Sequence, residues 1–200
     1  TLSLHDALPI WAAAFLEEKG DIDRAIEQSA AGADWQNAVR LIVAHGEAHF
    51  IESGRQDALS SWISRLPEER LADDHQLLYF KGMACMHVEP TEALELLSRS
   101  ADLARTRGDI AGQIRSLMAM LVIHTFTNET EKLVETASRI PVAASLLKDS
   151  WSRGVIIVAG LGRAVFEDEL KRAALLSRMA GRMKLDPQWQ LYYLLSSSIL

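Results

Sequence analysis

Apolar residues recur along this chain with the spacing of helices, and the pattern is clearest between Gly54 and Pro67. The apolar positions of this stretch are Leu59, Trp62, Ile63 and Leu66. Offsets of three and four residues place such side chains on one side of a helix. Proline lacks an amide hydrogen and pushes the preceding residue away from helical geometry. We therefore predict a helix over 54–66 whose last helical position is Leu66 or close to it. We expect Trp62 in its core, with a cost of about 3–5 kcal/mol for Trp62→Ala.

The rest of the chain shows the same succession of short amphipathic helices, separated by Gly, Pro or Asp. Glycines at 20 and 108 indicate helix stops, and aspartates at 21, 34 and 109 indicate N-caps. Residues 68–70 are expected to form a solvated connection. Helices are predicted at 10–19, 22–31, 35–51, 77–86, 90–107, 110–126 and 129–140, with further helices from about 152, over 167–184 and from 189.

A recurrence near 40 residues runs through the second half of the chain. Ala93-Leu94, Leu133-Val134 and Ala173-Ala174 are successively 40 residues apart. This period lies between those of TPR and HEAT repeats, which pack two helices per unit. We find no strand alternation. The pattern predicts an all-α fold, an α-α superhelix of TPR-like helical hairpins in which each pair covers the next.

Composition and charge narrow the class of protein. The chain is 48% hydrophobic and 24% charged, which is typical of a folded domain. Its net charge of −6 provides no excess of positive charge for a phosphate backbone, so we expect no direct DNA binding by these residues. The longest apolar run, 155–161, is too short to cross a bilayer. The single cysteine, Cys85, is expected to be a small buried hydrophobe in a reducing compartment.

The two ends look cut. The opening Thr1–Pro9 has the appearance of a translated adapter peptide and lacks the basic region and cleavage site of a signal peptide. We treat 1–9 as a non-native or disordered leader. Leu191 to Leu200 is largely apolar and has no helix stop after it, so we expect a truncated C-terminus.

One pattern of metal-ligating residue types is present. His45 and His49, with Glu52 one turn on, place two imidazoles and a carboxylate on adjacent helical turns, a geometry that can bind zinc. Their order differs from the His-Glu-x-x-His of metalloproteases, Gly46 lies within the pattern, and no further ligand is evident. We favour a polar helix face and assign no metal ligand.

Two further patterns suggest other chemistry. Val155 to Gly162 resembles a strand entering a glycine-rich phosphate loop, but Val165 stands where the third glycine belongs, so a closely packed helix is the favoured interpretation. Glu167, Asp168 and Glu169 suit the positive end of a helix dipole better than acid–base catalysis. We assign no catalytic and no cofactor-binding residue, and predict that the chain is not an enzyme.

Histidines and tryptophans are interpreted as packing residues. His87 and His124 lie in apolar stretches and are expected in the core or in a groove. The tryptophans Trp35, Trp62, Trp151 and Trp189 are expected to be mostly core anchors, and one or two of them could instead line a ligand pocket.

Several segments together resemble the MalT-like region of LuxR-family transcriptional regulators. They are Ala13–Gly20 (Ala-Ala-Phe-Leu-Glu-Glu-Lys-Gly), Ala25–Gln28, Asp34–Ala38, His45–Glu47 and Trp62–Pro67 (Trp-Ile-Ser-Arg-Leu-Pro). Their order and spacing match that family through about Pro67, and the repeats from Pro90 resemble its TPR-like superhelix. The resemblance implies that 10–67 links a winged-helix part to the repeats and that 68–200 is a truncated TPR-like superhelix.

What the resemblance implies about function is a sensor and oligomerisation segment in a bacterial, cytoplasmic signal-transduction protein. It would bind a small-molecule inducer or a partner protein on its helical surface, with possible self-association. ATP is implied only for a missing upstream module, and DNA binding only for a missing C-terminal helix-turn-helix domain. No cofactor is expected in this segment and no contact with membranes. The alternative is a generic TPR-type scaffold for protein–protein interaction.

Overall fold

A computed structural model describes residues 4–51, 54–127 and 129–140, and every regular element in these ranges is a helix. The elements are α1 (Leu4–Glu18), α2 (Ile22–Ala31), α3 (Trp35–His45), the π-helix η1 (Gly46–Ile51), α4 (Gln56–Ile63), α5 (Glu68–Ala72), α6 (His75–Cys85), α7 (Pro90–Thr106), α8 (Ile110–Phe126) and α9 (Thr130–Ser138). The predicted all-α helical-repeat fold is confirmed.

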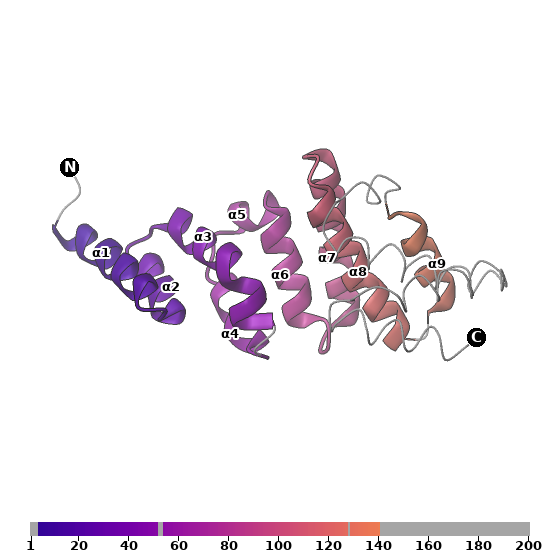
Figure 1. Ribbon diagram of the computed structural model, residues 1–200, viewed down its shortest axis with the longest axis horizontal. Coiled ribbons are helices and arrows are strands. Elements are labelled where there is room, and N and C mark those ends of the chain that lie inside the picture. The colour runs from indigo at the N-terminus through magenta and orange to yellow at the C-terminus, as the bar shows by residue number, and fades with distance from the viewer. Residues whose placement is uncertain (1–3, 52–53, 128, 141–200) are drawn as a thin grey trace, which may run out of the picture. The chain divides into compact units, whose positions relative to one another are not determined.

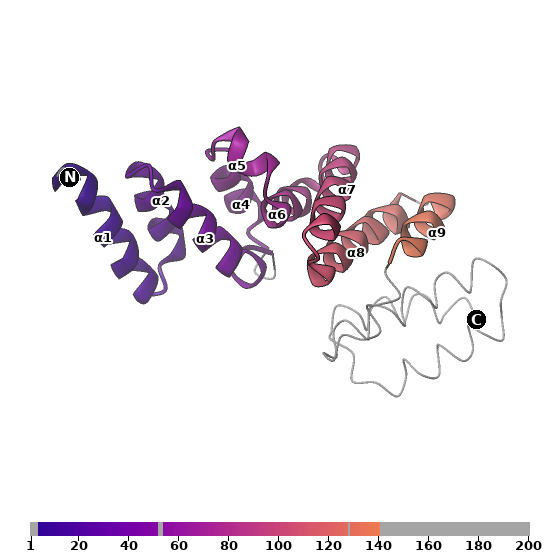
Figure 2. The ribbon, with the colours of Figure 1, turned by 90° about the horizontal axis from the view of Figure 1, so that it is seen from above.

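The chain divides into two compact units, residues 1–96 and 97–200, with the boundary inside α7. In the first unit α1 packs on α2, α2 on α3, and α4 on α6 (Figures 1 and 2). In the second unit α8 packs on α9. These helices therefore pack on near neighbours in sequence, as expected of a repeat array.

Helix ends follow the local sequence signals. Gly20 and Gly108, predicted as stops, have φ angles of 76° and 73°. This left-handed conformation is strained for residues that carry a Cβ. The predicted aspartate caps also form, because Asp21, Asp34 and Asp109 each accept a hydrogen bond from the amide three residues on.

Two helix boundaries differ from prediction. We expected the first helix to begin at Ile10, but α1 begins at Leu4 and contains Pro9. We expected the next helix to continue to about Leu66, but α4 ends at Ile63. The amides of Arg65 and Leu66 bond to the carbonyls three residues before them, so the last turn before Pro67 tightens out of α geometry.

The connection after Pro67 also differs from prediction. Residues 68–70 begin a five-residue helix, α5, instead of an irregular segment. None of the residues of α5 is buried, so the expectation of a solvated connection holds for its exposure.

The core of the first unit lies between successive helices. Its fully buried large side chains are Ile26, Leu41, Ile42, Leu59, Ile63, Leu77 and Leu78. Trp62 and Trp35 are half-buried, and so are not the full core anchors we expected. The Arg65 guanidinium lies over the Trp62 ring, 4.7 Å from its centroid. Phe15, which lies in an apolar run of the sequence, is 58% exposed.

In the second unit, two buried serines join α7 to α8. The Oγ atoms of Ser100 and Ser116 lie 2.8 Å apart, and both residues are fully buried. Arg139, which caps the end of α9, reaches back to Ser98 and Asp102 of α7 at 3.4 Å each. Leu97, Ile114 and Leu117 are fully buried around these contacts.

The 40-residue recurrence appears in the helix positions. α7 and α9 begin at Pro90 and Thr130, which are 40 residues apart, as predicted from Ala93 and Leu133. The same spacing separates the starts of α3 and α6, Trp35 and His75, which the sequence analysis missed. The third member, Ala173, lies outside the described residues.

Over the part of the chain that the structure describes, no helix combines the length and apolar character needed to span a bilayer.

Candidate functional site

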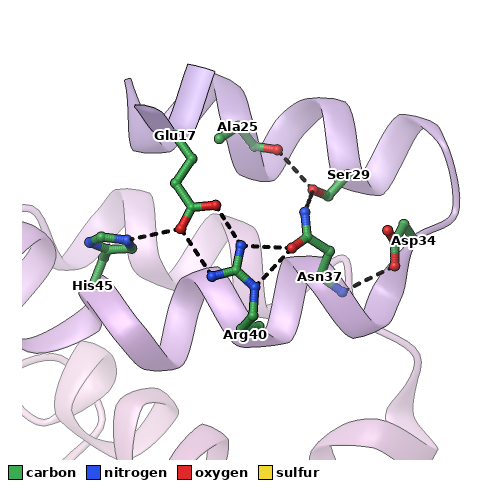
Figure 3. Close-up of polar contacts among 7 residues, drawn as sticks. All are labelled: Glu17, Ala25, Ser29, Asp34, Asn37, Arg40 and His45. Atoms are coloured by element: carbon green, nitrogen blue, oxygen red, sulfur yellow. Dashed lines mark hydrogen bonds and ion pairs between the residues drawn. The ribbon is translucent and has the colours of Figure 1, made fainter. Parts of the chain in front are cut away.

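A group of polar contacts in the first unit joins α1, α2 and α3 around Glu17 (Figure 3). Glu17 lies in the last turn of α1 and Arg40 in the middle of α3. Arg40 donates to the two carboxylate oxygens of Glu17, from Nη1 at 3.0 Å and from Nη2 at 2.5 Å. This two-pronged geometry is the strongest form of a carboxylate ion pair.

A histidine also approaches the same carboxylate. His45 Nε2, at the end of α3, is 3.7 Å from Glu17 Oε1. The hydrogen bonds from Arg40 lower the pKa of the Glu17 carboxyl below its usual 4.5, and His45 adds to the effect. The paired carboxylate in turn raises the pKa of Arg40. Glu17 is therefore ionised at neutral pH and is not suited to act as a general acid.

The contacts continue from α3 to α2. The Asn37 Oδ1 atom accepts from Arg40 Nε at 3.0 Å and from Nη2 at 2.8 Å. Asn37 Nδ2 donates to Ser29 Oγ at 2.9 Å, and the buried Ser29 hydroxyl donates to the Ala25 carbonyl. Glu17, Ser29, Asn37, Arg40 and His45, here called the Glu17 cluster, thus connect three helices through satisfied hydrogen bonds (Figure 3).

The Glu17 cluster is suited to holding helices together. Its strongest donors and acceptors already pair within the cluster, and it contains no nucleophile beside a base. The Glu17 cluster was not predicted from the sequence. Its contacts between helices join residues 8, 23 and 28 positions apart, so no local motif marks them.

The candidate zinc pattern is divided by a change in helix type. α3 ends at His45, and Gly46–Ile51 continues as the π-helix η1. His45 contacts Glu17, while the His49 side chain and Glu52 lie outside what the structure describes. Among the described side chains, no group of three His, Cys, Asp or Glu residues could hold a metal ion.

The start of η1 lies against α6. A Cβ atom built on Gly46 would be 2.6 Å from Cζ of the Phe80 ring, so only glycine allows this approach. Tyr79, next to Phe80, donates its hydroxyl to the Glu47 carboxylate at 3.3–3.4 Å. The glycine that argued against a zinc site therefore has a packing role.

The two histidines predicted as packing residues differ. His124 is 4% exposed, and its Nδ1 lies 3.1 Å from Glu129 Oε2, as expected of a satisfied core histidine. Contacts from Lys132 and His124 lower the pKa of Glu129. His87, in contrast, is exposed in the turn after α6, so the prediction for His87 is wrong. α6 ends at Cys85, before it reaches His87.

Cys85 is half-buried, less than the full burial we predicted. Its thiol donates to the Gly82 carbonyl at 3.6 Å. Desolvation, with Glu92 nearby, raises the pKa of the thiol.

Other candidates lie outside the described residues. These are the glycine-rich stretch Val155 to Gly162, the acidic run Glu167 to Glu169, and Trp151 and Trp189. The interpretations given for them stay predictions.

Comparisons with known proteins add no family assignment. Protein-family models, curated proteins and solved structures were compared with the chain, and none of them gives a significant match.

Proposed function

We propose that this chain is the sensor and oligomerisation segment of a LuxR/MalT-like transcriptional regulator. In this role it binds a small-molecule inducer or a partner protein on the surface of its helical array, in the cytoplasm. The array serves binding and not catalysis.

The observation that carries the proposal is the stacking of sequence-adjacent helices with repeated starts, at Trp35 and His75 and at Pro90 and Thr130. Helical arrays present extended surfaces made by several repeats, and such surfaces suit peptide or ligand docking. The segments that resemble the MalT-like region, including Trp62 to Pro67, lie within or next to these helices.

A sensor of this kind acts by differential affinity. A ligand that binds one arrangement of the helices more tightly than another shifts the population toward the first.

The sequence on either side of this chain in its gene tests the proposal. We expect a Gly-x-x-x-x-Gly-Lys-Ser/Thr phosphate loop upstream and a helix-turn-helix downstream. An open reading frame with neither module would contradict the regulator and favour the alternative, a TPR-type scaffold that docks peptides.

A further inference from the structure

The outer face of α1 carries an uncovered aromatic pair. Trp11 is 76% exposed and Phe15 is 58% exposed, although Ala13 on the same helix is fully buried. Trp11, Phe15 and Glu18 follow at offsets of four and three, so they share one side of the helix, with the exposed Ala14 beside them. We call Trp11, Ala14, Phe15 and Glu18 the α1 outer face. Contiguous exposed apolar side chains rimmed by polar residues are a feature of interaction sites.

The unit that carries this face has a net negative charge. Residues 1–96 contain 17 acidic and 7 basic side chains. Six of the seven basic side chains already contact a carboxylate or an aromatic ring of the same unit. These contacts are Arg24–Asp21, Arg40–Glu17, Arg55–Asp23, Lys81–Glu92, Lys19–Phe15 and Arg65–Trp62. Exposed acids, including Glu18 on α1 and Glu27 on α2, therefore dominate the potential that an approaching partner meets.

Local chemistry also favours a cation at this face. The Lys19 ammonium lies over the Phe15 ring, 5.5 Å from its centroid, so this ring attracts a positive group, and the side chain is still 58% exposed. Glu18 lies at the C-terminal end of α1, where the helix dipole is negative and attracts cations. Trp11 and Phe15 are thus on the same helix face as Glu18, near a helix end that attracts Lys or Arg side chains.

We propose that the α1 outer face binds a cationic amphipathic segment of a partner protein. Apolar side chains of the segment cover Trp11 and Phe15, and its Lys or Arg side chains meet Glu18 and the C-terminal end of α1. This inference rests on the binding role proposed above, and applies equally to a regulator and to a scaffold.

Fluorescence anisotropy with labelled peptides tests the inference on the full chain. The probe is a peptide of roughly 14 residues with leucine and arginine in helical spacing. One comparison peptide has Glu in place of Arg, and another has Ser in place of Leu. We expect the Leu/Arg peptide to bind, with weaker affinity as salt rises from about 50 to about 300 mM, and at least about ten-fold more tightly than either comparison peptide.

Variants locate the binding site. The double variant Trp11→Ser/Phe15→Ser should weaken binding at least about ten-fold, and Glu18→Lys should weaken it about three-fold. Val88→Ser is the matched control, because Val88 is 80% exposed but lies in the turn after α6, and it should leave affinity unchanged. All four substituted side chains are exposed, so thermal melting of the variants should match that of the parent chain.

Three outcomes would overturn the inference. They are the absence of peptide binding, equal binding of the Glu-containing peptide, and equal affinity in the double variant. Self-association of the parent chain that the double variant abolishes would show instead that a second copy covers the face. If the gene encodes the regulator modules but the Leu/Arg peptide does not bind, this inference is wrong and the proposed function is unaffected.

Discussion

At the scale of single residues, Gly46 has no room for a larger side chain. Gly46→Ala places a methyl group within 2.6 Å of the Phe80 ring, so the ring or the start of η1 must move. Overpacking of this kind costs about 1–3 kcal/mol. We expect urea denaturation to show a loss in this range.

The Phe80 ring provides the control for this prediction. In a Phe80→Leu background the added methyl group has more room, so Gly46→Ala should cost less there. An equal cost in both backgrounds would mean that the ring is not what constrains Gly46.

Helix α4 carries one fully buried and one half-buried apolar side chain, Leu59 and Trp62. Trp62 is half-buried, so Trp62→Ala should cost about 1–2 kcal/mol, below the range for an enclosed aromatic site. Leu59 is fully buried, and Leu59→Ala should cost about 2–5 kcal/mol. Chemical denaturation of the two variants compares them directly. A larger loss of stability for Trp62→Ala than for Leu59→Ala would contradict this difference in burial.

At the scale of elements, the link from α1 to α3 through Glu17 and Arg40 should depend on pH. The folded pKa of Glu17 lies below 4.5, so its contribution to stability is complete above that pH. The contribution disappears as the pH falls through the folded pKa. Exposed pairs contribute about 0.2–1 kcal/mol, and Arg40 is half-exposed, so the effect should be small and sensitive to salt.

A double-mutant cycle with Glu17→Gln and Arg40→Gln measures this contribution by chemical denaturation. We expect a favourable coupling free energy at pH 7 that declines as the pH falls below 4.5 and through the lowered pKa of Glu17. Glu27→Gln, on an exposed position of α2, serves as the control and should show no coupling to Arg40. Coupling that persists unchanged at low pH would show that ionisation of Glu17 does not contribute to it.

Helix ends were predicted best where they depend on residues close by in the sequence. Gly20, Asp34 and Asp109 act within one helical turn, and each forms the stop or cap that we expected. Asp74 caps α6 in the same way, accepting from the amides of Gln76 and Leu77, but was overlooked in an acidic stretch.

Features that depend on distant residues could not be predicted in this way. The Glu17–Arg40 pair joins residues 23 positions apart, and the approach of Gly46 to Phe80 depends on how α6 packs. The partial burial of Trp62 likewise follows from its neighbours in space, because helical spacing gives the face of a side chain but not the depth of its cover. The polar cluster was therefore found only in the structure.

At the scale of the whole molecule, stability in a repeat array arises from contacts between neighbouring helices. Leu41→Ala removes a fully buried side chain from α3 at a cost of about 2–5 kcal/mol. We expect hydrogen exchange to accelerate mainly in the helices of the first unit.

Leu117→Ala, a substitution at an equally buried position on α8, is the matched variant in the second unit. It should accelerate exchange mainly in α8 and α9. If both variants accelerate exchange uniformly along the chain, the two units unfold as one cooperative block.

The lone thiol of Cys85 has a practical consequence for labelling. Its raised pKa keeps it protonated at neutral pH, and a protonated thiol reacts slowly with maleimides and oxidants. A second cysteine introduced at the exposed position 88 would therefore be modified first. Spectroscopic probes can thus be attached at a chosen site without removing the natural cysteine.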